Sequence, residues 1–180
     1  MMQIQQIHHV AYRCKDAKET IEFYTKHLNM RFLLAISEDR VPSTKEPNPY
    51  MHVFLDAGHG NILAFFELPN SPPMGRDANT PQWVQHIAFQ LATVPDLMQA
   101  KADLESAGIE VVGPTDHGII QSIYFFDPNG HRIELTTVTA TPDQLQRLDE
   151  VKWQMLEDWS RSKQTVRQAE WLHQHEFTQA

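Results

Sequence analysis

The chain has 180 residues, 41% of them hydrophobic, and a formal net charge of −8. This length and composition fit one folded domain with an appendage. The acidic balance argues against nucleic-acid binding, and no apolar run approaches the ~18 residues that cross a bilayer. Residues 1–6 lack a signal-peptide pattern, and Cys14 is the only cysteine, so we expect a cytoplasmic protein that does not associate with membranes.

The first part of the chain predicts a βαβββ module. Asp16 has the pattern of a helix N-cap with an acidic residue, Glu19, three positions later. Apolar residues then recur at helical spacing up to Leu28. A proline-containing segment over 37–49 is expected to be an exposed loop. The expected strands cover residues 7–13, 30–36, 50–56 and 61–68.

The pattern restarts near His86, where Gln85-His86-Ile87-Ala88-Phe89 resembles the segment around His9. A helix is expected from Thr93 to Ala107, with Gly108 just beyond its end. Strands follow at 109–112, 122–126 and 132–136. The sequence therefore predicts an α+β fold with two tandem βαβββ modules, at about 5–69 and 83–138, within a domain that spans 1–140.

Residues 141–180 predict a C-terminal helical tail. Thr141-Pro142-Asp143 is a strong helix start, with Thr as N-cap and Pro at the first helical position. One apolar stripe follows, and we expect it to pack on the body of the protein or on a partner chain in a homodimer. The stripe consists of Leu145, Leu148, Val151, Met155 and Trp159.

The segment from Thr115 to Glu134 predicts two apolar strands joined by the turn Asp127-Pro128-Asn129-Gly130. Glu134 lies in the second strand, in a run otherwise suited to burial. A buried carboxylate is costly unless it is paired or bound to a metal. We therefore expect partners for Glu134 elsewhere in the chain.

The duplication supplies those partners. His9 and His86 occupy the first strands of the two halves, and Glu67 and Glu134 occupy the last strands. The two histidines are 77 residues apart and the two glutamates are 67 residues apart. This difference of ten residues fits an insertion at 37–49. Imidazoles combined with carboxylates suit Fe(II), Mn(II), Zn(II) or Ni(II), so we predict a divalent-metal site.

On these residues the chain resembles the vicinal oxygen chelate superfamily, which includes glyoxalase I, fosfomycin-resistance proteins and type I extradiol dioxygenases. The resemblance covers residues 5–138. It implies an open, barrel-like cleft in which the metal binds a small-molecule substrate through adjacent oxygens. His9, His86 and Glu134 match the ligand positions shared across the superfamily, and Glu67 matches the fourth ligand of the glyoxalase I branch.

The 115–134 segment resembles the extradiol dioxygenase signature, through His117, Tyr124 and the Asp-Pro-x-Gly turn. In that family the equivalents of His117 and Tyr124 line the pocket and hydrogen-bond the catecholate. The family also has an acid–base histidine just before the last strand of the first module. In this chain the corresponding histidine is His59, which is displaced by one position in the sequence. His59 is therefore the third catalytic candidate.

The resemblance implies an extradiol-type dioxygenase, with Fe(II) favoured, that acts on a small catecholic or vicinal-oxygen compound. A glyoxalase-I-like lyase or isomerase that stabilises an enediolate is the alternative, because Glu67 as a fourth ligand would leave fewer open metal positions for a diol and O₂. The other alternative is a non-catalytic resistance protein that binds a small molecule. Such proteins often lack the ligands that this chain keeps.

Overall fold

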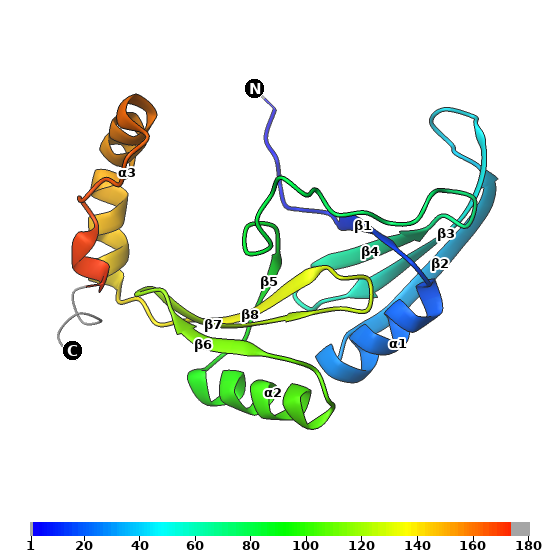
Figure 1. Ribbon diagram of the computed structural model, residues 1–180, viewed down its shortest axis with the longest axis horizontal. Helices are drawn as coiled ribbons and strands as arrows, with labels where there is room; N and C mark the ends of the chain where they lie inside the picture. The colour runs from blue at the N-terminus through cyan, green and yellow to red at the C-terminus, as the bar shows by residue number, and fades with distance from the viewer. Residues whose placement is uncertain (1, 174–180) are drawn as a thin grey trace. The chain divides into compact units, whose positions relative to one another are not determined.

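The computed structural model describes residues 2–173 and has an α+β fold (Figure 1). Two tandem modules each contain a four-stranded sheet and a helix, and a further helix follows them, as the sequence predicts. Within residues 2–173, no helix is both long enough and apolar enough to span a membrane. Two compact units organise the chain, and each is described below by itself.

The first unit runs to Ile87 and also includes Phe126–Ile133. In its sheet the strand order is β1-β4-β3-β2, with β1 parallel to β4 and the other pairs antiparallel. The elements are β1 (Val10–Cys14), α1 (Ala17–Leu28), β2 (Arg31–Arg40), β3 (Pro47–Asp56) and β4 (Ile62–Glu67).

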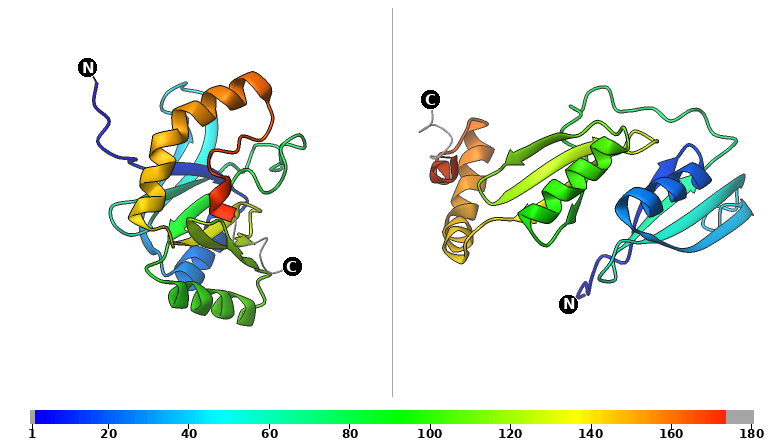
Figure 2. Two further views of the ribbon diagram at one scale, coloured as in Figure 1. Left: turned by 90° about the vertical axis from the view of Figure 1, so that its left-hand side faces the viewer. Right: turned by 90° about the horizontal axis from the view of Figure 1, so that it is seen from below.

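Helix α1 covers one face of this sheet (Figure 2). Its N-cap is Asp16, whose side chain accepts a hydrogen bond from the Glu19 backbone N–H at 2.8 Å. Its C-cap is Asn29, in the left-handed conformation with φ of 51°. The buried ring of Tyr24 lies 5.2 Å from the ring of Phe65 in β4. The core of this unit therefore lies between α1 and the sheet.

The expected exposed loop at 37–49 is mostly strand. β2 continues to Arg40 and β3 begins at Pro47, and these two residues face each other in the antiparallel pair. The prolines of this segment favour a loop. Pro47 is instead the first residue of its strand, a place where a missing N–H is tolerated. The insertion thus lengthens a hairpin.

The turn between the last two strands belongs to the first unit and is held by a buried carboxylate. Asp127 accepts hydrogen bonds from the Tyr24 hydroxyl at 3.1 Å and from the His131 backbone N–H at 2.7 Å. Asn129 accepts a 2.8 Å hydrogen bond from the Lys15 backbone N–H. The Asp-Pro-Asn-Gly sequence therefore shapes the turn and also attaches it to the start of α1.

The second unit contains Ala88–Phe125 and the chain from Glu134 onward. The second sheet has the order β5-β8-β7-β6. Helix α2 lies along one face of it (Figure 2) and buries Leu97 and Leu104. The elements are β5 (Ile87–Gln90), α2 (Val94–Ser106), β6 (Val112–Asp116), β7 (Ile120–Phe126) and β8 (Arg132–Val138).

Helix α3 (Pro142–Ser162) begins with the predicted Thr141 cap, which forms a complete capping box with Gln144. A short 3₁₀ helix, η1 (Glu170–His173), follows it. No described residue of α3 is buried, and Trp159 is 48% exposed. The apolar stripe thus forms on the helix as predicted, but much of it faces solvent.

Candidate functional site

Glu134 is the buried carboxylate at the centre of the candidate site. It is 3% exposed, and its Oε1 accepts hydrogen bonds from the Ser122 hydroxyl at 2.5 Å and from the Tyr124 hydroxyl at 3.3 Å. Ser122 and Tyr124 are two residues apart on β7, so they lie on one face of the sheet. The opposite face carries the buried apolar residues Ile123, Phe125, Ile133 and Leu135.

His117 joins this group through Tyr124, because His117 Nε2 lies 2.7 Å from the tyrosine hydroxyl. A phenol has one hydrogen to donate. If Tyr124 donates it to Glu134, then Nε2 of His117 must carry a hydrogen and donate to the tyrosine oxygen. The order His117, Tyr124, Glu134 is therefore a continuous path along which a proton can move. The second unit brings together three of the predicted site residues.

His9 is exposed and lies just before β1. Its Nδ1 shares a 2.8 Å hydrogen bond with Nδ1 of His8. A hydrogen bond at the ring nitrogen that does not bind the metal orients a ligating imidazole and fixes its tautomer. Nε2 is then the nitrogen through which His9 would bind a metal.

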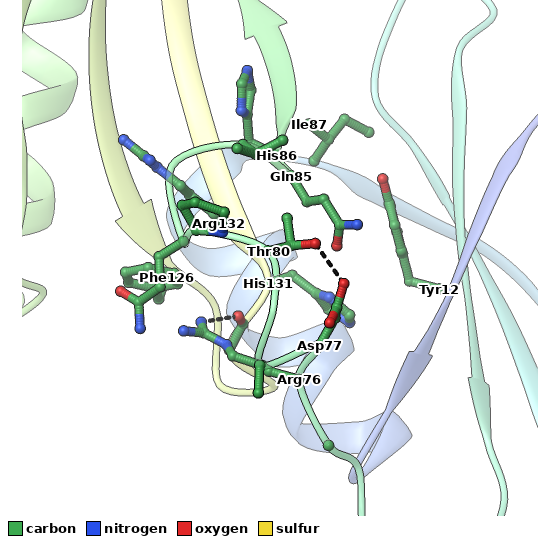
Figure 3. Close-up of a pocket in the computed structure, with 16 residues that line it drawn as sticks. Tyr12, Arg76, Asp77, Thr80, Gln85, His86, Ile87, Phe126, His131 and Arg132 are labelled. Atoms are coloured by element: carbon green, nitrogen blue, oxygen red, sulfur yellow. Dashed lines mark hydrogen bonds between the residues drawn. The ribbon is translucent and has the colours of Figure 1, made fainter.

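His86 is exposed, precedes β5 and lines a pocket of about 740 Å³ within the first unit (Figure 3). Tyr12 and Arg132 also contribute to the lining. Arg76 is also in the lining, and its guanidinium donates a 2.5 Å hydrogen bond to the Gly130 carbonyl oxygen. It also lies 4.8 Å from the centre of the Phe126 ring. The pocket thus offers cationic and aromatic groups beside a candidate ligand.

Glu67 has a different environment from Glu134. Its Oε2 accepts a 2.7 Å hydrogen bond from the backbone N–H of Ala17, the first residue of α1. It alternates with Phe65 along β4, so its side chain lies on the face that α1 covers. A carboxylate at a helix N-terminus satisfies an unpaired N–H and is stabilised by the helix dipole. The structure therefore assigns Glu67 a helix-capping role.

The strand register gives the same result. Cys14 and Leu91 each follow the histidine of their own half by five residues. Cys14 pairs with Glu67, whereas the Leu91 backbone N–H donates to the carbonyl oxygen of Thr136. Glu67 therefore corresponds to the end of β8, beyond Glu134. The sequence spacing matched the two glutamates, but the strand pairing does not.

His59 lies in the turn between β3 and β4. It is exposed and has a φ of 52°, a left-handed conformation in which histidine is over-represented. Over residues 2–173, no group of three or more His, Cys, Asp or Glu side chains is arranged to hold a metal ion. The catalytic role of His59 and the full ligand set thus remain predictions.

Ser122, beside Glu134, and His52, beside His9, were not predicted from the sequence. Ser122 could have been found from its two-residue spacing to Tyr124 on one strand face. His52, on β3, stacks on Phe66 with ring centres 3.5 Å apart. Its Nε2 is buried and has no hydrogen-bond partner among the described residues. Burial and the nearby charge of His9 lower the pKa of His52. Only the folded structure could reveal this environment.

Comparison with protein families gives a match over residues 6–135, which contain all but the ends of the two modules, to the model described as Glyoxalase/Bleomycin resistance protein/Dioxygenase superfamily. The chain belongs to this superfamily. The described part of the C-terminal extension, from Thr141 to His173, lies outside the matched region.

Members with different activities are similar to this chain. Biphenyl-2,3-diol 1,2-dioxygenase 3 of Rhodococcus globerulus is 34% identical over 101 residues, which are 54% of this chain and 51% of the relative. The match therefore spans about half the length of that relative. Lactoylglutathione lyase of Pseudomonas aeruginosa is 26% identical over 71% of this chain and 79% of the relative.

Solved structures of the superfamily share the fold. A fosfomycin resistance protein of Listeria monocytogenes, in a complex with Mn(II), matches with a TM-score of 0.54 and 20% identity. The match covers 76% of this chain and 95% of that protein. At this level of identity the likeness concerns the fold alone.

Proposed function

We propose that this protein is an extradiol-type dioxygenase that acts on a small catecholic compound. In that reaction the ring C–C bond beside the two hydroxyls is cleaved and both atoms of O₂ enter the product. The observation that carries the proposal is the Tyr124 hydroxyl, which contacts both His117 and the buried Glu134. The similarity to a biphenyl-2,3-diol dioxygenase supports it.

The side-chain types of the three predicted ligands suit a divalent metal. Glu134 is buried, and two hydroxyl donors orient its carboxylate. Two imidazoles and one carboxylate are the ligands of non-haem iron oxygenases. His9, His86 and Glu134 would hold the metal, with Fe(II) favoured over Mn(II), Zn(II) or Ni(II), and when bound it would supply the redox and Lewis-acid chemistry of the reaction.

The roles of the other residues follow from their contacts. His117 holds or releases a proton at Nε2, and Tyr124 relays hydrogen bonding between His117 and the carboxylate. Glu67 is left out of the proposed ligand set because it caps α1. Three protein ligands leave more positions open to a diol and O₂ than four would.

Anaerobic reconstitution with Fe(II), followed by oxygen uptake with biphenyl-2,3-diol and a panel of smaller catechols, tests the proposal. We expect stoichiometric oxygen consumption and a ring-cleaved product. Tyr124→Phe should lower kcat by about 10²–10⁴-fold, the usual contribution of general acid–base catalysis. Tyr50→Phe, a tyrosine variant outside both the His117–Tyr124–Glu134 group and the lining of the His86 pocket, is the matched control. Absence of oxygen uptake with every diol would overturn the proposal.

A glyoxalase-I-like lyase is the second candidate, because the lactoylglutathione lyase match covers 79% of that relative. The candidate would use Glu67 as the fourth ligand. Activity on a hemithioacetal with Ni(II), Co(II) or Zn(II), together with loss of metal in Glu67→Ala, would support it over ring cleavage. The expected homodimer and cytoplasmic location stay predictions, and sedimentation analysis of the purified protein tests the first.

A further inference from the structure

The segment that follows α3 turns back along the helix, as the orange-to-red part of the chain shows (Figure 1). Lys163 ends the helix in a left-handed conformation. The Gln168 amide then donates a 2.7 Å hydrogen bond to the Asp158 carboxylate. Farther along, the Arg147 guanidinium lies 3.9 Å from the centre of the Trp171 ring. Because Arg147 lies near the start of α3, the segment returns along the helix.

This segment ends against the loop that carries His117. A Cβ atom at Gly118 would lie 2.9 Å from the backbone oxygen of Leu172 and 3.3 Å from its Cβ. Any side chain larger than hydrogen at Gly118 would therefore displace Leu172 or the loop. The glycine also has a φ of 80°, which L-residues rarely adopt. The close approach of the two segments thus depends on this glycine.

The residues just before α3 hold the same loop through its backbone. The carbonyl oxygen of Ile119 accepts hydrogen bonds from the backbone N–H groups of Thr139 and Ala140, at 3.0 Å and 2.9 Å. These two residues directly precede the Thr141 cap of α3. The chain just before α3 and the segment after it therefore both contact the three-residue loop 117–119, and both lie outside the region that matches the superfamily.

We infer that Trp171 and Leu172 are positioning residues that act through His117. Together they hold the 117–119 loop so that the imidazole stays within hydrogen-bond reach of the Tyr124 hydroxyl. The inference rests on the proposed function, because it assigns His117 and Tyr124 to proton handling. A shift of 1 Å in a catalytic group can cost about 10²-fold in rate, so a modest loosening of the loop has a measurable effect.

Trp171→Ala in the full-length Fe(II) enzyme is the direct test, with Trp153→Ala as the matched control because Trp153 is 69% exposed on α3. We expect Trp171→Ala to lower kcat by about tenfold, with KM within about twofold of the original, while Trp153→Ala retains both. The nitrogen resonances of the His117 imidazole should change in Trp171→Ala alone. Unchanged kcat and unchanged His117 resonances in Trp171→Ala would overturn the inference.

A second pair of variants tests the contact without relying on catalysis. Gly118→Ala and Gly108→Ala are both at a φ of 80°, but a Cβ at Gly108 would meet no atom within 4 Å. We expect faster proteolytic removal of the C-terminal segment in Gly118→Ala alone, and equal rates would contradict the inference. If the wild-type protein consumes no oxygen with any diol, the proposed function fails, whereas the proteolysis and the His117 resonances still decide whether the segment holds the loop.

Discussion

The Ser122 hydroxyl lies 2.5 Å from Glu134 Oε1, and both side chains are buried. A hydroxyl that donates to a metal-ligating carboxylate fixes the orientation of that ligand. Ser122 therefore supports the proposed ligand from the neighbouring strand. It has this contact whether the protein is a dioxygenase or a lyase.

Ser122→Ala should weaken metal binding. Loss of an outer hydrogen-bond partner typically costs about 10–100-fold in metal affinity. Calorimetric titration of the metal-free protein with Mn(II) measures the change, and Ser106→Ala, on the exposed surface of α2, serves as the control. An affinity equal to that of the wild type would show that Glu134 does not bind the metal or does not need this donor.

Glu67→Ala should lower the stability of the protein and leave its metal content intact. The Ala17 N–H loses its 2.7 Å acceptor, and loss of a helix cap costs about 1 kcal/mol. Urea denaturation gives the free energy of unfolding, and elemental analysis gives the metal content. Glu134→Gln is the comparison, since it should lose metal. Loss of metal in Glu67→Ala would instead restore the four-ligand site.

Asp127→Ala should destabilise the first unit. Tyr24 is 1% exposed, and its hydroxyl donates a hydrogen bond to the Asp127 carboxylate. Burial raises the pKa of Tyr24, and the neighbouring Asp127 carboxylate raises it further. A buried donor without its acceptor costs about 1–3 kcal/mol. Thermal denaturation should show a clear fall in Tm, whereas Asp149→Ala, at an exposed position of α3, should behave like the wild type.

The stability of the metal-free protein should fall in mild acid because of His52. Burial, followed by the charge of His9, lowers the pKa of His52 from 6.5. The unfolded chain therefore binds a proton there more readily than the folded chain, so stability is lost as the pH falls below about 6.5. His52→Phe should lose less Tm between about pH 7.5 and about pH 5.5 than the wild type. His59→Asn is the control, and an identical loss in all three proteins would contradict the assignment.

Much of the fold could be predicted from the sequence because its signals are local. The cap at Asp16, the turn at Asp127–Gly130 and the start of α3 at Thr141 depend on residues a few positions apart, and all three form as expected. The strand limits were less accurate. β6 begins at Val112, where the expected strand ended, because pairing with β7 decides its position.

The site was only partly predictable because it depends on which face of a sheet each residue occupies. A shift of one residue in a strand moves a side chain to the other face. The sequence spacing matched Glu67 with Glu134, but the pairing of Glu67 with Cys14 places its carboxylate at α1. The contact of Leu172 with Gly118 joins segments more than fifty residues apart, and no local pattern predicts it.

The contact at Gly118 has a practical consequence for anyone who expresses this protein in pieces. A fragment trimmed just past the superfamily match, at the end of β8, would lack both Trp171 and the residues that hold Ile119. Such a fragment would keep every proposed ligand and still, on our inference, turn over slowly.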